Sequence, residues 1–182
     1  MNTAVILVMA LMPLAAQDIK IPPSLDRLAD KASDVVDVTL DSSMLQMASK
    51  FLSDKDTDEA KAKKLVGGLK GIYVKSFEFE KPGEYDMSDV EAIRSQLRAP
   101  GWSRIVGVKS KKSGDNAEVY VRNENGKITG LTVIATEPKE LTIVNIVGSI
   151  DPEQLSELGG HFGIPKVDTG GAKKSTGAEK DN

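Results

Sequence analysis

The chain has 182 residues, with 24 Lys and Arg, 27 Asp and Glu, one His and no Cys, so its net charge is −3. The absence of Cys excludes disulfides, thiol nucleophiles and cysteine-ligated metal sites. The slight excess of acid argues against a nucleic-acid partner, whose phosphates need a basic face, and the length suits one domain with short appendages.

The chain begins with an apolar leader. Residues 4–16 are almost all apolar, which is too short for a membrane-spanning helix of about 20 residues but suits the hydrophobic part of a secretory signal peptide. Ala15 and Ala16 provide small residues before a cleavage point. We therefore expect residues 1–16 to be a signal peptide and the protein to be exported, to the periplasm or outside the cell. No Cys follows, so we expect no lipid anchor; the alternative is a buried N-terminal strand or helix.

A lead-in and a first strand follow the leader. Residues 17–34 contain a helical stripe with Ser24 as a candidate N-cap. Residues 36–41 then alternate between apolar and polar side chains, a period of two that predicts a strand with one wet face. Asp37 and Asp41 fall on that wet face.

Two helices and a long strand are predicted next. Apolar residues at spacings of three and four, among them Met44, Met47 and Phe51, predict an amphipathic helix over 44–52, and a similar stripe predicts another over 62–69. Residues 70–80 have the pattern of a strand. Its apolar phase changes parity, so we expect a bulge near residues 75–76.

The rest of the chain is mostly strand. Ser88 and Glu91 form a candidate capping box for a short helix. Turn signals, including Asn125-Gly126, then separate four strands, and such short connections force antiparallel neighbours. The strands are expected at residues 104–110, 117–122, 128–136 and 141–150. The prediction is one α+β domain over residues 35–165, with a mostly antiparallel sheet of about six strands and helices on one face.

The C-terminal part is predicted to form a last helix of the domain, followed by a disordered tail. Asp151 and Pro152 are suited to begin a helix that places Leu155 and Leu158 inward and ends at the glycines before His161. Residues 166–182 contain no aromatic residue and few apolar ones, so we expect a disordered tail.

Five residues are candidates for binding. Glu118, Tyr120 and Arg122 share the wet face of their strand, and Asp37 and Asp41 share the wet face of theirs. A polar sheet face that carries a tyrosine and an arginine could bind a ligand or a partner protein. The alternative is an ordinary solvated face of an antiparallel sheet.

Catalytic and metal signatures are absent from the sequence. His161 has neither a second His nor a nucleophile motif to work with. The acidic run at residues 54–59 lacks the glycine and the glutamate that a calcium loop needs, because those positions hold Glu59 and Leu65. We expect no catalytic residues, no metal and no cofactor.

Several motifs of the second half resemble a known family when they are taken together. They are the segments Pro100–Val106, Ala117–Val121, Gly130–Glu137, Glu140–Ile150 and Gly159–Pro165. The chain from about Val38 to Pro165 resembles the DUF4252 family, bacterial domains of unknown function. The resemblance implies an exported protein, often a lipoprotein, encoded in many cases near extracytoplasmic sigma and anti-sigma factors. It implies no catalytic residues, and the absence of Cys departs from the lipoprotein form.

These observations favour an exported, non-catalytic envelope protein that binds an envelope protein or a small ligand, with a link to envelope-stress signalling through the resemblance. Two alternatives stay open. One is a hydrolase-like periplasmic enzyme that uses paired carboxylates. The other is a membrane-peripheral module, which the acidic balance disfavours because anionic lipid attracts Lys and Arg. The oligomeric state is not predicted.

Overall fold

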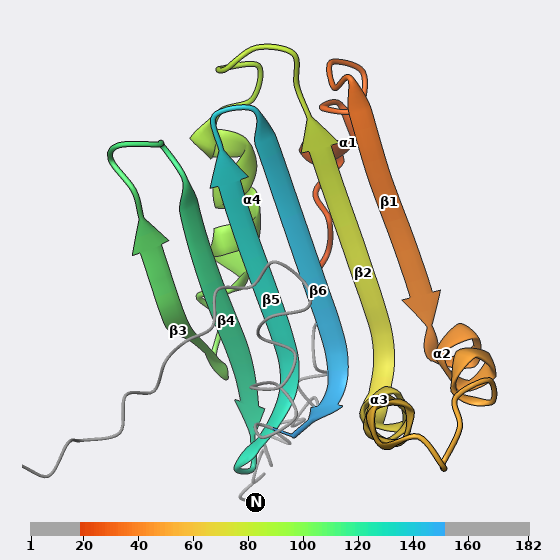
Figure 1. Cartoon of the computed structure of the whole chain (residues 1–182). Helices are drawn as coiled ribbons and strands as arrows, with labels where there is room; N and C mark the ends of the chain where they lie inside the picture. The colour runs from red at the N-terminus through yellow and green to blue at the C-terminus, as the bar shows by residue number, and fades with distance from the viewer. Residues whose placement is uncertain (1–18, 152–182) are drawn as a thin grey trace, which may run out of the picture.

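A computed structural model describes residues 19–151 of the chain. Its centre is one six-stranded antiparallel sheet in the order β1-β2-β6-β5-β4-β3 (Figure 1). The strands are β1 (Asp34–Asp41), β2 (Leu69–Glu78), β3 (Trp102–Lys109), β4 (Asn116–Glu124), β5 (Lys127–Glu137) and β6 (Glu140–Ile150). The helices are α1 (Pro23–Asp26), α2 (Ser42–Ser49), α3 (Thr57–Gly68) and α4 (Met87–Gln96). The predicted α+β class and the six antiparallel strands are confirmed.

The helices divide between the two faces of the sheet. In Figure 1, α1 and α4 lie behind the sheet, and α2 and α3 lie at the end where β1 stops and β2 starts. The expectation of helices on one face therefore holds for α1 and α4. In contrast, Leu45 of α2 and Val66 of α3 pack with side chains of the opposite face. We call the face under α1 and α4 the covered face and the opposite one the open face.

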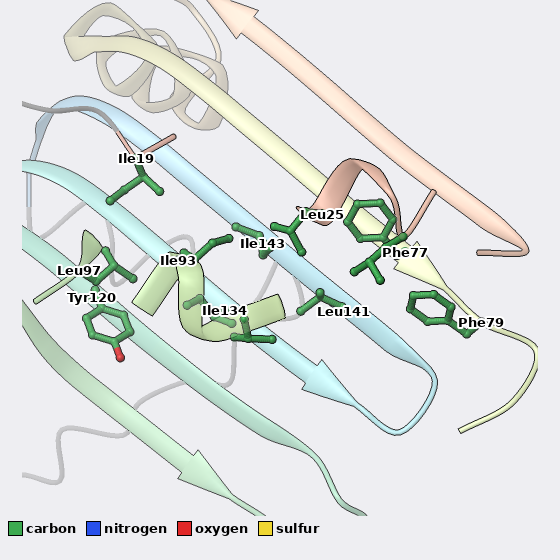
Figure 2. Packing of buried hydrophobic residues seen from close by; sticks show 12 residues of the cluster. Ile19, Leu25, Phe77, Phe79, Ile93, Leu97, Tyr120, Ile134, Leu141 and Ile143 are labelled. Atoms are coloured by element: carbon green, nitrogen blue, oxygen red, sulfur yellow. The ribbon is translucent and has the colours of Figure 1, made fainter. Parts of the chain in front are cut away.

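The main core lies on the covered face. Figure 2 shows Ile93 of α4, Leu97 just after that helix and Leu25 of α1 packed over side chains from four neighbouring strands. The sheet residues of this core are Phe77, Tyr120, Ile134, Leu141 and Ile143, joined at the edge by Phe79 and Ile19. Most of them are almost fully buried. Burial of each such side chain stabilises the fold by about 1.5–3 kcal/mol.

The caps of two helices differ from the sequence prediction. α1 has only four residues and its N-cap is Pro22, not Ser24, although the buried Leu28 beyond its end continues the apolar stripe. The capping box of α4 is formed by Asp86 and Asp89 rather than by the predicted pair. An aspartate at the N-cap accepts backbone N–H groups as well as serine does, and the earlier pair sets the start of the helix.

The bulge expected at residues 75–76 of β2 is absent. β2 pairs in unbroken register with both β1 and β6 from Gly71 to Glu78, and its irregularity lies between Leu69 and Gly71. The parity change needs no bulge, because the sheet has apolar side chains on both faces. Ile72 points to the open face and Phe77 to the covered face.

Several predictions concern residues outside the described range. They are the signal peptide at 1–16, the helix that begins after Asp151, His161, the disordered tail at 166–182 and the domain limit at 165. These stay predictions. Between residues 19 and 151, no helix is both long enough and apolar enough to cross a lipid bilayer.

Candidate binding face

Glu118 is held in an ion-paired cluster between α4 and the β3–β4 hairpin. Its carboxylate accepts a hydrogen bond from Arg94 Nε at 2.6 Å and another from Arg104 Nη1 at 3.0 Å. Burial alone raises the pKa of Glu118, but the hydrogen bond and charge of Arg94, followed by those of Arg104, outweigh it and hold the pKa below its usual value. A carboxylate of lowered pKa stays ionised at neutral pH, so it is poorly suited to donate a proton.

The neighbours of Glu118 on β4 lie on the covered face. Tyr120 is only 9% exposed and belongs to the main core. Burial, followed by the charge of Glu118, raises the pKa of its phenol. The expectation that Tyr120 lies on a wet face is therefore wrong, because α4 packs on that side. Arg122 pairs with Glu124 at 2.8 Å.

The two aspartates of β1 have structural partners. Asp37 lies 3.3 Å from the ammonium of Lys75, which also pairs with Asp26 of α1 at 2.8 Å. This bridge ties α1 to the sheet. Asp41 is the N-cap of α2, where its carboxylate accepts the backbone N–H groups of Ser43 and Met44.

The five predicted residues do not form one site. Asp37 and Glu118 fall in the same row across the sheet, but three strands separate theirs. With about 4.8 Å between neighbouring strands, they lie about 19 Å apart. An open depression of about 550 Å³ adjoins Glu118 and is also lined by Arg94, Arg104 and Lys109. It has room for a small ligand but holds only one of the five predicted residues.

The open face shows a regular feature that we had not predicted from the sequence. Six valines, one from each strand, stand directly opposite one another and cross the whole sheet. This valine row consists of Val38, Val74, Val144, Val133, Val119 and Val106. All six are half-buried. A parallel aliphatic row lies nearer α2 and α3 and consists of Leu40, Ile72, Ile146, Leu131 and Val121.

Towards the other end, the open face becomes more exposed and then acidic. Val36 and Val108, at the two edges of the next row, are both 49% exposed. Beyond them lies an acidic row from four adjacent strands: Asp34, Glu78, Glu140 and Glu137. The side chain of Glu140 accepts hydrogen bonds from the hydroxyls of Ser76 and Thr142, which fixes it on this face.

Within residues 19–151, none of the four carboxylates of the acidic row forms an ion pair. Burial, followed by the negative charges of Glu140 and Asp115, raises the pKa of Glu137. The described residues contain no cluster of three potential metal-ligating side chains, so these acids do not converge as a metal site would require. The row is a strip of like charge bordering an apolar surface.

A sequence signal for this face does exist. The segments 131–135 and 143–147 are almost continuously apolar. That pattern is typical of strands with apolar contacts on both faces, whereas a strand with one wet face alternates. The cross-strand register that aligns six valines depends on turn lengths and bulges, and so becomes visible only in the folded sheet.

A family model described as Domain of unknown function (DUF4252) matches residues 29–158, which is most of the chain. It covers all six strands and continues seven residues beyond the described range. No curated protein and no solved structure matches the chain.

Proposed function

Because this chain belongs to the DUF4252 family, whose description names no activity, we propose from its own geometry that it is an exported, non-catalytic binding module of the cell envelope. The open face carries the proposal. It joins the half-buried valine row to the acidic row, whose carboxylates form no ion pair within residues 19–151, and a solvated sheet face needs neither feature. Apolar patches bordered by polar groups mark interaction sites in soluble proteins.

The side chains of the open face indicate what chemistry its partner needs. Valines offer a flat apolar surface without hydrogen-bonding groups, so the partner needs apolar side chains of its own. The acids beside them favour cations, since opposite charges steer association and suppress wrong partners. We therefore take the partner to be a basic, amphipathic segment of another envelope protein.

Three observations support the other parts of the proposal. The paired carboxylate of Glu118 and the wide separation of Asp37 from it disfavour a carboxylate enzyme, which needs two convergent acids with divergent pKa values. The apolar leader at residues 4–16 favours export. The resemblance noted above favours a role in envelope-stress signalling.

Site-specific cross-linking in cells of the natural host tests the proposal. The photoreactive variant Val144→p-benzoylphenylalanine is expected to form an adduct with a partner protein through a segment rich in Lys or Arg. The matched control is Thr39→p-benzoylphenylalanine, an exposed position on the opposite face of β1. Adducts of equal yield at both positions, or none at Val144, would count against the open face as the binding surface.

A second experiment examines the acidic row and export. The double variant Glu137→Gln with Glu140→Gln is expected to reduce the Val144 adduct, whereas Asp37→Asn on the other face leaves it unchanged. Cell fractionation with N-terminal sequencing is expected to find a chain that starts near Gln17 outside the cytosol. A cytosolic chain that retains Met1 would contradict the part of the proposal that places the protein in the cell envelope.

A membrane surface is the second candidate partner, because α2 carries an exposed apolar stripe. Met44 and Met47 of α2, and Phe51 just after it, were predicted to form the apolar stripe of an amphipathic helix, but they are 49%, 62% and 84% exposed, and Leu45 is buried instead. An apolar stripe beside a lysine such as Lys50 suits an anionic bilayer surface. Flotation with anionic vesicles that is lost in Phe51→Ser would support this candidate.

A further inference from the structure

The two edges of the sheet carry opposite charges. β1 and β3 are its edge strands, and within residues 19–151 no strand pairs with the outer side of either. β1 contains three aspartates and no basic residue, whereas β3 contains Arg104 and Lys109 and no acidic residue. A free edge is a template for another strand, and like charges on facing strands oppose such pairing. The charges therefore disfavour the pairing of either edge with its own kind and favour the pairing of one edge with the other.

Apolar side chains are exposed on both edges. Val35 and Val36 of β1 are 45% and 49% exposed, and Val108 of β3 is 49% exposed. Val36 and Val108 lie on the open face, two residues along from the ends of the valine row at Val38 and Val106. Branched side chains of this kind pack well against one another across neighbouring strands. A strand that paired with either edge would remove them from water.

A second copy of the sheet fits beside the first in the same orientation. All neighbouring strands are antiparallel and the sheet has six of them, so β1 and β3 run in opposite directions (Figure 1). A copy placed side by side with the first, with the same face outward, therefore brings its β1 antiparallel to β3. The bulge of β3 lies between Arg104 and Val106, so residues 106–109 form a regular stretch that can pair. β1 is regular over its whole length.

The valine row sets the register between the copies. The row ends at Val38 on one edge of the sheet and at Val106 on the other. A sideways shift along the row therefore places Val106 opposite Val38 of the second copy. In an antiparallel pair, Val108 then faces Val36 of that copy, so two valine pairs form on the open face.

The same register brings opposite charges together on the covered face. Gly107 faces Asp37 of the second copy, and it leaves room there because it has no side chain. The guanidinium of Arg104 lies over Gly107, since its carbon is 3.6 Å from the position of a Cβ at that glycine. Lys109, two residues along the strand, is diagonal to Asp37 of the second copy, which a long side chain can reach. The carboxylate of Asp37, whose side chain is 54% exposed, would thus lie between two cations.

We propose that copies of this chain associate side by side, with residues 35–38 of one copy paired to residues 106–109 of the next. The contact is heterologous, because each copy offers a different edge to each of its neighbours. Every assembly therefore keeps one free edge of each kind, grows as an open row and extends the valine row from copy to copy. The proposal does not rest on the binding function above, because it concerns the edges of the sheet.

Disulfide trapping tests the pairing directly, because the chain has no Cys of its own. Val38 and Val106 are five strand spacings apart within one chain, about 24 Å, which no disulfide can span. The chain with both Val38→Cys and Val106→Cys is expected to form a ladder of oligomers under mild oxidation, and the two single variants to form a dimer only when they are mixed. Lys111→Cys, in the turn after β3, is the matched control for Val106→Cys and should form no dimer with Val38→Cys. The absence of a ladder would overturn the proposal, and so would dimers of either single variant alone in the same yield.

Charge reversal on one edge gives an independent readout in sedimentation velocity. Lys109 is exposed and forms no ion pair within residues 19–151, so Lys109→Glu is expected to fold normally. It should raise the concentration needed for association at least tenfold, whereas Lys111→Glu, the same change of charge in the adjacent turn, leaves that concentration unchanged. A monomeric unmodified chain, or equal association of the two variants, would contradict the proposal. If Lys109→Glu fails to fold, the disulfide ladder decides the matter.

Discussion

Two adjacent residues of β6 allow the two faces of the sheet to be compared in one strand. Ile143 is 1% exposed and packs in the main core under α4. Val144, its neighbour, points to the open face and belongs to the half-buried valine row. The variants Ile143→Ala and Val144→Ala remove methyl and methylene groups from the same strand, so their effects report how fully each face is covered.

The expected losses of stability differ severalfold. Ile143→Ala deletes three buried carbons at about 0.8 kcal/mol each, and the enclosed cavity left behind raises the loss in the free energy of unfolding to about 3–4 kcal/mol. Val144→Ala deletes two carbons of a side chain that is still partly exposed, and it leaves no closed cavity. We expect it to cost about 1–1.5 kcal/mol.

Urea denaturation followed by circular dichroism measures both values. An unchanged dependence of the free energy on urea would show that the variants alter stability rather than the extent of unfolding. A loss of more than about 2 kcal/mol for Val144→Ala would mean that a well-packed layer covers the valine row. That result would refute the description of this row as an accessible surface, and with it the proposed binding role.

Three further predictions concern local features of the fold. The pKa of Glu118 is lowered in the folded state, so the ionised carboxylate contributes its full stability at pH values above the ordinary pKa of 4.5, and this contribution is lost as the pH falls through the folded-state pKa. Glu118→Gln should therefore lower the free energy of unfolding at pH 7 and make that free energy depend less on pH under acidic conditions. Asp41→Ala should lower the Tm because it removes the N-cap of α2, and Asp41→Asn, which keeps a capping oxygen, should have a Tm close to that of the unmodified chain. An equal Tm for Asp41→Ala and the unmodified chain would show that the cap contributes nothing. Gly148→Ala should be strongly destabilising in thermal unfolding, because Gly148 has a φ of +136° and a Cβ there would lie 2.5 Å from the Cα of Leu69; Gly67→Ala, with nothing within 4 Å, is the control.

The candidate site could be predicted only in part. The sequence placed Glu118, Tyr120 and Arg122 on one strand face, and the structure keeps them together. It could not show that α4 covers this face, because the position of a helix over a sheet depends on contacts distant in sequence. Arg94, which pairs with Glu118, was missed for the same reason.

Local chemistry in the sequence determined the elements of this protein. Alternating side chains, turn residues such as Asn125-Gly126 and short connections were sufficient to predict six antiparallel strands within one α+β domain. The family resemblance came from the same segments. These features act over a few residues, so they can be read directly along the chain.

Only the tertiary structure decided what the two faces of the sheet became. Register across six strands aligned one valine from each and gathered four acids into a row, although the members of each row lie far apart in the sequence. The placement of α1 and α4 buried Tyr120 and left the opposite face open. Alternation shows that a strand has two different faces, but which face is covered depends on the packing of the whole chain.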